Sequence, residues 1–426
     1  MYNKTVFANG IRLITERTPS RTASFGIWID VGSRDEDLDG SGAAHFIEHM
    51  LFKGTPGRDA GAIARELDRL GGQANAFTTK EHTCLYGTVI DAQLPQLVAL
   101  LSDLFLHSLF PEDEIERERM VVLQEIGMSQ DTPEDLIHDL FAGVLWTGHP
   151  LSRPVLGQPE LIATMTNPCL QRFWQQGYLP ERVLIAAAGN IEHDELAALL
   201  APLRAWHPVA PSTQGPLARV APAPLPPRLL VQPKRLEQAH LLLGGPGFPA
   251  HTEARYALAL LNTILGGNMS SRLFQEVREK RGLAYSIYSF VDGLSDTGMV
   301  GIYAGIGHET VNQVRELIGT VIADIRSGGI TLDELRGAKE FTRAGVILAE
   351  ESMEARMQRL AKNELTLGRH VPIQEVEAAL ERVRLDEVTD IAATLFASPF
   401  GGVVLGPVRA DTCEPETSLL VSDDDY

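Results

Sequence analysis

Two histidines and a glutamate stand within five residues of one another, in His45-Phe46-Ile47-Glu48-His49. Residues four apart on a helix lie about 6 Å apart along its axis on one face, so both imidazoles can reach one metal ion at roughly 2.0–2.1 Å. Glu48 then lies beside that ion, where its carboxylate can accept a proton from water. The order H-x-x-E-H therefore predicts a hydrolytic zinc site of the inverted zincin type. The plainer alternative is three polar positions on a half-exposed helix.

A catalytic zinc needs a third protein ligand and an open position, so a further Asp, Glu, His or Cys is expected in the same half of the chain. The predicted helix at 112–128 offers Glu118 and Glu125, which are seven residues apart and project from one face. Apolar residues on that face indicate that at least one carboxylate is partly buried and needs a partner. The alternative is an exposed acidic helix with Arg117 and Arg119 as solvated neighbours.

Residues 42–55, Gly-Ala-Ala-His-Phe-Ile-Glu-His-Met-Leu-Phe-Lys-Gly-Thr, closely resemble the signature of the pitrilysin/insulinase family of zinc peptidases. The most similar subgroup is that of mitochondrial processing peptidase and its short bacterial relatives. The resemblance implies one Zn²⁺ per chain, held by His45, His49 and Glu125, which stands 76 positions after His49. It also implies that Glu118 lies beside these ligands without binding the ion.

Two further stretches resemble parts of the same family. Residues 71–78 resemble the edge strand that pairs with an extended substrate, which would place Asn75 and Ala76 opposite the scissile bond. Arg278 and Tyr285 resemble an Arg-Tyr pair whose donors hold the substrate carbonyl and stabilise an oxyanion. Without the resemblance, the first stretch is a turn leading into a strand. The second is then a charge on an exposed helix followed by the start of a buried strand.

Substrate preference depends on two carboxylates. Asp135 and Asp139 lie four apart on a predicted helix, at positions that resemble the acidic pocket for arginine in the mitochondrial processing enzyme. Paired carboxylates can bind a guanidinium group bidentately. A solvated acidic helix face explains the two residues equally well.

The resemblance implies a metalloendopeptidase that cleaves unfolded peptides or oligopeptides inside a clamshell chamber, with Glu48 as the general base and the linker as a hinge. Because the chain carries both the zinc motif and the Arg-Tyr pair, we expect a homodimer in which the partner's second half completes each site. The alternative is a noncatalytic structural or assembly subunit, related to the core proteins of respiratory complexes. A metal assay separates the two, because a scaffold should bind no stoichiometric zinc.

Hydrophobic periodicity predicts the elements that position these residues. A hairpin around Asn9-Gly10 opens the first half, because this dipeptide suits a type I′ turn. Strands are predicted at 5–7, 11–14, 24–31, 83–90, 183–188, 240–244, 284–291 and 299–304. Helices are predicted at 42–52, 59–70, 93–107, 112–128, 134–146, 253–265, 310–325 and 332–350. The second half thus repeats the order of the first, and its helix at 253–265 lacks H-x-x-E-H.

The expected fold is α+β, with two homologous sandwiches that each have a mixed sheet covered by helices. Residues 1–208 are predicted to form an N-terminal zinc-binding catalytic domain. Residues 209–228 are rich in proline and are predicted to form an extended linker. Residues 229–426 are predicted to form a C-terminal domain, a diverged repeat that carries Arg278 and Tyr285.

Bulk composition narrows the class of protein. A chain of 426 residues exceeds what one core normally organises, which favours two domains. A formal net charge of −19 disfavours nucleic acid and anionic membrane surfaces as partners. No apolar run approaches the roughly 20 residues of a membrane span, and the N-terminus lacks the layout of a secretory signal, so we expect a cytoplasmic protein without membrane insertion. Cys84, Cys169 and Cys413 are too few and too scattered for a disulfide framework or a cysteine-based metal site.

Overall fold

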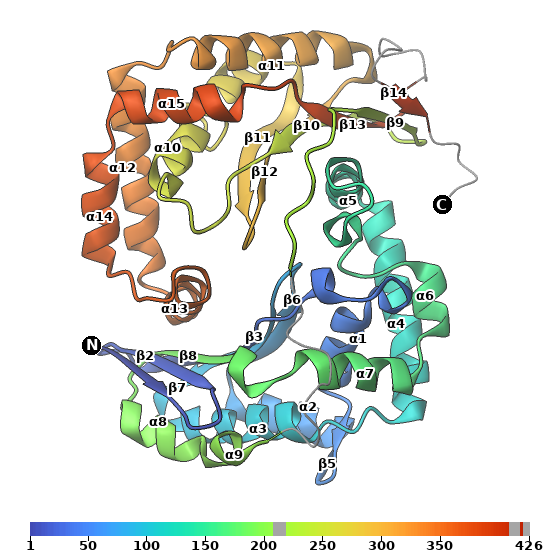
Figure 1. The fold of residues 1–426 in the computed structure, drawn as a ribbon, viewed down its shortest axis with the longest axis vertical. Coiled ribbons are helices and arrows are strands. Elements are labelled where there is room, and N and C mark those ends of the chain that lie inside the picture. The colour runs from blue at the N-terminus through green and yellow to red at the C-terminus, as the bar shows by residue number, and fades with distance from the viewer. Residues whose placement is uncertain (208–218, 409–417, 421–426) are drawn as a thin grey trace. The chain divides into compact units, whose positions relative to one another are not determined.

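The computed structural model describes residues 1–207, 219–408 and 418–420, which form two compact units (Figure 1). Neither unit is one continuous stretch of the chain. Unit 1 contains Met1–Met128, the described part of Arg153–Arg219 and Leu348–Val371, and unit 2 contains Ser129–Ser152, Val220–Ile347 and the described part of Pro372–Tyr426. This division differs from predicted domains at 1–208 and 229–426, because one segment of each half belongs to the other unit. The predicted linker at 209–228 lies partly outside the described residues, and residues 219–228 contain no helix or strand.

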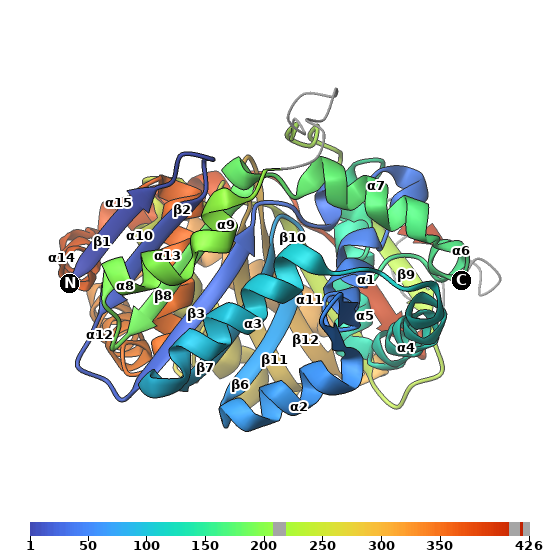
Figure 2. The ribbon, with the colours of Figure 1, turned by 90° about the horizontal axis from the view of Figure 1, so that it is seen from below.

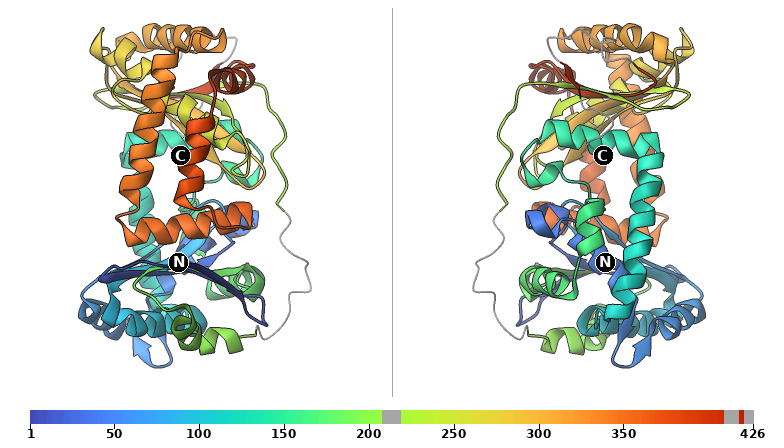
Figure 3. Two further views of the ribbon diagram at one scale, coloured as in Figure 1. Left: turned by 90° about the vertical axis from the view of Figure 1, so that its left-hand side faces the viewer. Right: turned by 90° about the vertical axis from the view of Figure 1, so that its right-hand side faces the viewer.

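Unit 1 is a six-stranded mixed sheet with helices on both faces. Its strands are β1 (Tyr2–Val6), β2 (Arg12–Arg17), β3 (Thr22–Ile29), β6 (Gln73–Thr78), β7 (Thr83–Ile90) and β8 (Val183–Gly189). A separate two-stranded hairpin consists of β4 (Gly54–Thr55) and β5 (Arg58–Asp59). Its helices are α1 (Ala43–Met50), α2 (Ala60–Leu70), α3 (Leu94–His107), most of α4 (Glu112–Asp131), α6 (Pro159–Thr164), α7 (Asn167–Gly177), α8 (His193–Leu199), α9 (Ala201–Ala205) and α13 (Met353–Leu367). Figure 2 shows α3 in front of the sheet, running along its strands, and α4 is seen along its length in the right-hand view of Figure 3.

Unit 2 is built in the same way. Its strands are β9 (Leu229–Pro233), β10 (Ala239–Pro246), β11 (Ala284–Gly293), β12 (Gly298–Ile306), β13 (Gly401–Gly406) and β14 (Ser418–Leu420). Its helices are α5 (Pro133–Leu145), α10 (Arg255–Leu265), α11 (Val311–Arg326), most of α12 (Leu332–Ala349), α14 (Ile373–Arg382) and α15 (Leu385–Leu395). A π-helix covers Phe274–Glu279.

The two sheets share one strand order. In unit 1 the order is β6-β7-β3-β8-β2, and in unit 2 it is β11-β12-β10-β13-β9. In each sheet the first three pairings are antiparallel and the fourth is parallel. Only the sixth strand differs, because β1 pairs antiparallel with β2 whereas β14 pairs parallel with β9. The predicted α+β fold of two related sandwiches is therefore confirmed.

Each sheet receives on its second face a helix from the opposite half of the sequence. Helix α13 packs against β2, β3 and β8 of unit 1, and α5 packs against β10 and β13 of unit 2. A glycine lies beneath this helix in both cases, Gly26 in β3 and Gly244 in β10. A Cβ on Gly26 would lie 2.9 Å from Met357 Sδ, and a Cβ on Gly244 would lie 2.7 Å from Phe141 Cζ. At Gly244 the added Cβ would also lie 2.2 Å from the backbone oxygen of Val300, so the neighbouring strand as well as α5 requires glycine there.

The apolar side chains of each unit gather in two layers. The larger core of unit 1 packs α1, α3 and α4 against the sheet, and a smaller cluster lies between the sheet and α13. Unit 2 has the same pair of layers, the smaller one under α5. Among the described residues, no single helix is both long and apolar enough to cross a membrane, and one sharply bent pair, residues 91–107 with Glu112–Asp131, meets that test by length and composition alone.

Candidate metal centre

Helix α1 carries both histidines of the motif on one face. Gly42 precedes the helix with a φ of 95°, a conformation that glycine adopts without strain. The Nε2 atoms of His45 and His49 then lie 3.3 Å apart, one helical turn from each other. Burial, followed by the charge of His49, lowers the pKa of His45 to about 3. His45 is therefore neutral and has a ring nitrogen available to bind a cation.

Helix α4 brings a carboxylate to the same point. Glu125 Oε2 lies 3.6 Å from His45 Nε2 and 3.4 Å from His49 Nε2. An ion with tetrahedral bonds of about 2.0–2.1 Å has its ligands about 3.3–3.4 Å apart, so the three atoms are spaced like one face of such a tetrahedron. Within the described part of the chain, these three residues are the one group of His, Cys, Asp and Glu side chains that could hold a metal ion. Two imidazoles and one carboxylate suit zinc and leave a fourth position open.

Glu118 fixes the orientation of His49. The Nδ1 atom of His49 lies 3.0 Å from Glu118 Oε2, and this carboxylate can only accept a hydrogen bond. In the neutral form that binds a metal, this contact places the proton of the His49 imidazole on Nδ1 and leaves Nε2 as the ligand atom. Lys53 Nζ lies 2.6 Å from the other carboxylate oxygen of Glu118, so this buried charge is paired.

Glu48 lies beside the three ligands. The hydroxyl of Thr78, on β6, donates a hydrogen bond of 2.6 Å to Glu48 Oε2. Burial raises the pKa of Glu48 above its usual value, while the Thr78 hydrogen bond and the nearby His49 oppose the rise and Glu125 adds to it. A carboxylate held in this way, and with some affinity for a proton, is suited to general base chemistry.

Strand β6 forms the end of the unit 1 sheet, so its outer edge pairs with no strand that the structure describes. Asn75 is exposed and Ala76 is buried, as alternation along a strand requires. The backbone N–H of Ala76 donates to Asn75 Oδ1 at 2.9 Å. A peptide that binds to this N–H must displace the asparagine oxygen.

The other four predicted site residues belong to unit 2 and are not part of the metal cluster. The guanidinium of Arg278, on the π-helix, lies 5.5 Å from the ring centroid of Tyr285, whose side chain is largely exposed. Asp135 is exposed and Asp139 is half-buried on α5.

Three contacts of the centre were not predicted from the sequence. These are Thr78 with Glu48, Lys53 with Glu118, and Glu36 with the start of α1. Thr78 and Lys53 stand within stretches that resemble the family, but residue type alone does not show what they touch. Glu36 has only the weak signal of an acidic residue shortly before a helix.

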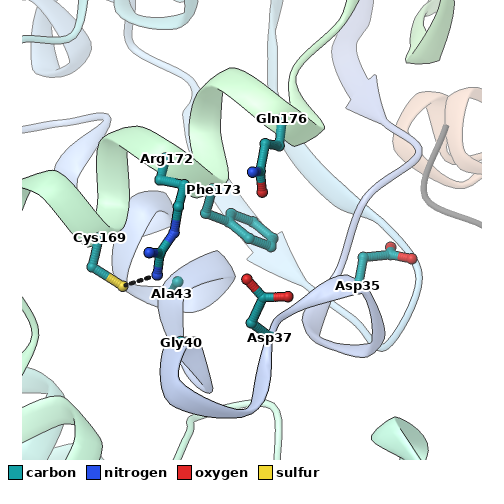
Figure 4. Close-up of a pocket in the computed structure, with 8 residues that line it drawn as sticks. All are labelled: Asp35, Asp37, Gly40, Ala43, Cys169, Arg172, Phe173 and Gln176. Carbon is teal, nitrogen blue, oxygen red and sulfur yellow. Dashed lines mark hydrogen bonds between the residues drawn. The ribbon is translucent and has the colours of Figure 1, made fainter. Parts of the chain in front are cut away.

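A shallow pocket lies near the start of α1, between residues 35–43 and α7 (Figure 4). It is lined by Asp35, Asp37, Gly40, Ala43, Cys169, Arg172, Phe173 and Gln176. None of the predicted site residues lines it. The residues suited to hydrolysis therefore lie elsewhere in unit 1.

Known protein families match most of the chain. Residues 12–159 match the family described as Insulinase (Peptidase family M16), and residues 164–341 match the family described as Peptidase M16 inactive domain. An uncharacterized zinc protease of Mycobacterium tuberculosis is 42% identical over 95% of this chain and 93% of its own length. An uncharacterized zinc protease of Bacillus subtilis is 39% identical over 94% of this chain and 97% of its own length.

Two solved structures share the fold. A protease from Helicobacter pylori aligns with a TM-score of 0.87 at 21% identity, over 96% of this chain and 99% of that one. A peptidase M16 inactive domain from Pseudomonas fluorescens aligns with a TM-score of 0.88 at 23% identity, over the same shares. The two family matches cover most of the chain, and a relative named a zinc protease is 42% identical over nearly the whole of both chains. The chain belongs to the insulinase family of peptidases, peptidase family M16.

Proposed function

We propose that this protein is a zinc metallopeptidase that hydrolyses peptide bonds in unfolded peptides or oligopeptides. The observation that carries the proposal is the convergence of His45 Nε2, His49 Nε2 and Glu125 Oε2 at 3.3–3.6 Å from one another. Relatives that are named zinc proteases support the choice of metal and reaction.

Each residue of the centre has a separate task in this reaction. A bound zinc ion supplies the Lewis acidity that polarises a carbonyl and lowers the pKa of water. Glu48 takes the proton of the attacking water and passes it to the leaving amine. The Thr78 hydroxyl holds the Glu48 carboxylate in place, and Glu118 holds the His49 ring.

Substrate binding is proposed to use the free edge of β6, next to the Thr78 that holds Glu48. Main-chain pairing with an extended peptide at Asn75 and Ala76 would accept many side chains. In the same proposal Arg278 and Tyr285 hold the substrate carbonyl, and their contact with one another supports a joint role. Asp135 and Asp139 are proposed to favour basic residues, and the chamber is proposed to be completed in a homodimer.

The test replaces Glu48 by glutamine, which keeps the size of the side chain but cannot take up the proton. Hydrolysis of a fluorogenic peptide should fall by about 10²–10⁴-fold, while one zinc per chain is retained. Glu340→Gln, an exposed glutamate on α12, is the control and should leave both unchanged. A wild-type rate for Glu48→Gln would refute the mechanism. A wild-type protein with no stoichiometric zinc and no chelator-sensitive hydrolysis would instead favour the noncatalytic subunit.

A further inference from the structure

Arg219 is one of the residues at which the chain leaves unit 1 for unit 2. Its side chain is turned into unit 1 and is only 17% exposed. Its Nε and Nη2 atoms donate to the two carboxylate oxygens of Asp35, at 2.9 and 2.8 Å. Its Nη1 atom donates to Asp30 Oδ1 at 2.8 Å, and Nη2 also donates to the backbone oxygen of Glu81. Such a bidentate, many-bonded contact fixes a guanidinium in both position and orientation.

The carboxylate next to Asp35 holds the metal-binding helix. Asp35 ends the short 3-10 helix η1 (Ser33–Asp35), and Glu36 follows it. Glu36 Oε2 accepts the N–H of Gly42 at 2.9 Å, and Glu36 Oε1 accepts the N–H of Ala44 at 2.8 Å. Glu36 is therefore a buried cap for the first turn of α1, supplied from outside the helix. Arg153 holds Glu36 in turn, through a 2.6 Å hydrogen bond to its backbone oxygen.

A small displacement of this cap reaches the metal site directly. Helix α1 has only eight residues, and His45 is the third of them, next to the capped Ala44. Metal bonds tolerate deviations of only about 0.2 Å, so a shift of the first turn changes the spacing between His45 Nε2 and the other two ligand atoms. Asp35 and Glu36 thus join the interunit segment to the metal helix through two adjacent residues.

We propose that Arg219 is a positioning residue for the metal centre, which ties the start of the segment between the units to the loop that caps α1. This inference rests on one part of the proposed function, the binding of zinc by His45, His49 and Glu125. It also fixes the chain to unit 1 at Arg219, the last residue before residues 220–228, four of which are prolines and which lead into unit 2. Tight metal binding in unit 1 then requires this end of the connecting segment to be in place.

The experiment compares zinc affinity, measured by competition with a chromogenic chelator, in the full chain and three variants. Arg219→Met should weaken zinc binding by about 10-fold, the lower end of what loss of an outer support of a metal site costs. Arg219→Lys should recover part of the affinity, since it restores the charge but not the bidentate geometry. Arg17→Met is the control. It breaks an ion pair with Glu192 whose two side chains are both half-exposed, and it should leave the zinc affinity unchanged.

A second measurement separates positioning from simple stabilisation. If Arg219 and the metal helix are coupled, saturating zinc should raise the thermal midpoint of the wild type more than that of Arg219→Met. Asp35→Asn combined with Arg219→Met should weaken zinc binding no more than Arg219→Met alone, because the two act through one contact. If Arg219→Met does not fold, Arg219→Lys and Asp35→Asn give the same comparison.

The outcomes distinguish this inference from the proposed function. Wild-type zinc affinity in Arg219→Met, Arg219→Lys and Asp35→Asn, with only a lower thermal midpoint of the metal-free protein, would make Arg219 a structural anchor and overturn the inference. The proposed function would stand in that case. Absence of zinc binding by the wild type would instead overturn the proposed function.

Discussion

The two units have the same order of strands in the sheet but differ in the helix that follows β3 in unit 1 and β10 in unit 2. In unit 1 this helix is α1, with His45, Glu48 and His49 on its surface. In unit 2 it is α10, whose buried residues are almost all alanine, leucine and isoleucine. The shared strand order does not depend on metal ligands, so one copy of the fold can bind a metal while the other does not.

The long helices α4 and α12 differ in the same sense. Counted from the first residue of each helix, Glu118 and Glu125 of α4 correspond to Ala338 and Gly345 of α12. Unit 2 has thus no counterpart of either carboxylate at these positions. This agrees with the match of residues 164–341 to a family described as inactive.

The strongest test of this difference removes the ligand that α4 supplies. Glu125→Ala should weaken zinc binding by about 10³-fold or more, beyond the 10–100-fold that loss of an outer partner costs. Glu340→Ala, on α12, should have no effect on zinc content. Stoichiometric zinc in Glu125→Ala, measured by mass spectrometry after dialysis, would show that the ion is held elsewhere.

Helices α13 and α5, which each come from the opposite half of the sequence, are a feature that the two units share and that can be tested. Met357 of α13 is fully buried and accepts a 3.3 Å hydrogen bond from Trp28 Nε1, and Phe141 of α5 is buried against the sheet of unit 2. Met357→Ala and Phe141→Ala should each lower the free energy of unfolding by about 3 kcal/mol, because each leaves a cavity beside a strand glycine. Chemical denaturation measures this. A loss below about 0.5 kcal/mol, the range of ordinary surface substitutions, would mean that the helix is not integral to its unit.

The orientation of His49 can be tested separately from metal coordination. Glu118→Gln keeps a side chain of the same shape but weakens the acceptor for His49 Nδ1–H and removes the charge that pairs with Lys53. Zinc affinity should fall by about 10–100-fold. Unchanged affinity in this variant would show that Glu118 does not support His49.

The smallest predicted effect concerns the start of α12. Hydrogen bonds from Arg272 lower the pKa of Glu334 to about 2, and the N–H of Thr331 contributes as in a capping box. Because folding lowers the pKa of Glu334, its ionised carboxylate stabilises the folded protein at pH values above the pKa of the unfolded chain. This stabilisation is lost as the pH falls from about 4.5 to 2. Since Glu334 is partly exposed, Glu334→Gln should cost only about 1 kcal/mol at neutral pH, and nothing near pH 2.

The matched control is Glu114→Gln in α4. Glu114 holds the same place in its helix, but Pro111 stands where unit 2 has Thr331 and offers no N–H to cap. The loss of stability should therefore be smaller than in Glu334→Gln, when both are measured by thermal unfolding across this pH range. Equal losses at all pH values would refute the role of the Glu334 cap.

Local signals in the sequence were sufficient for much of the fold. Strand β7 has its predicted bounds, and the predicted hairpin turns at Asn9-Gly10. The predicted type I′ turn is wrong, because of the two residues only Gly10, at 97°, has the positive φ that this turn needs at both, and the N–H of Gly10 donates to the backbone oxygen of Phe7. The helix predicted at 59–70 is α2, and Asp59 caps it, with its side chain accepting the N–H of Ala62. Such features depend on neighbours within a few residues, which is what periodicity and capping rules describe.

Contacts between distant segments were not accessible in this way. Periodicity shows that α5 has an apolar face but not which sheet that face covers, and α13 was not predicted at all. The seven-residue spacing placed Glu118 and Glu125 on one face, whereas their different roles came from a resemblance. The contacts of Arg219 with Asp35 join residues 184 positions apart, and no local rule describes them.

The proposed function depends most on a single ion held by His45, His49 and Glu125. Crystallography of the zinc-loaded protein at the zinc absorption edge tests it most directly. One anomalous peak is predicted at about 2.0–2.2 Å from His45 Nε2, His49 Nε2 and Glu125 Oε2. Zinc bound only elsewhere, or a Glu125 side chain turned away from both histidines, would contradict the account.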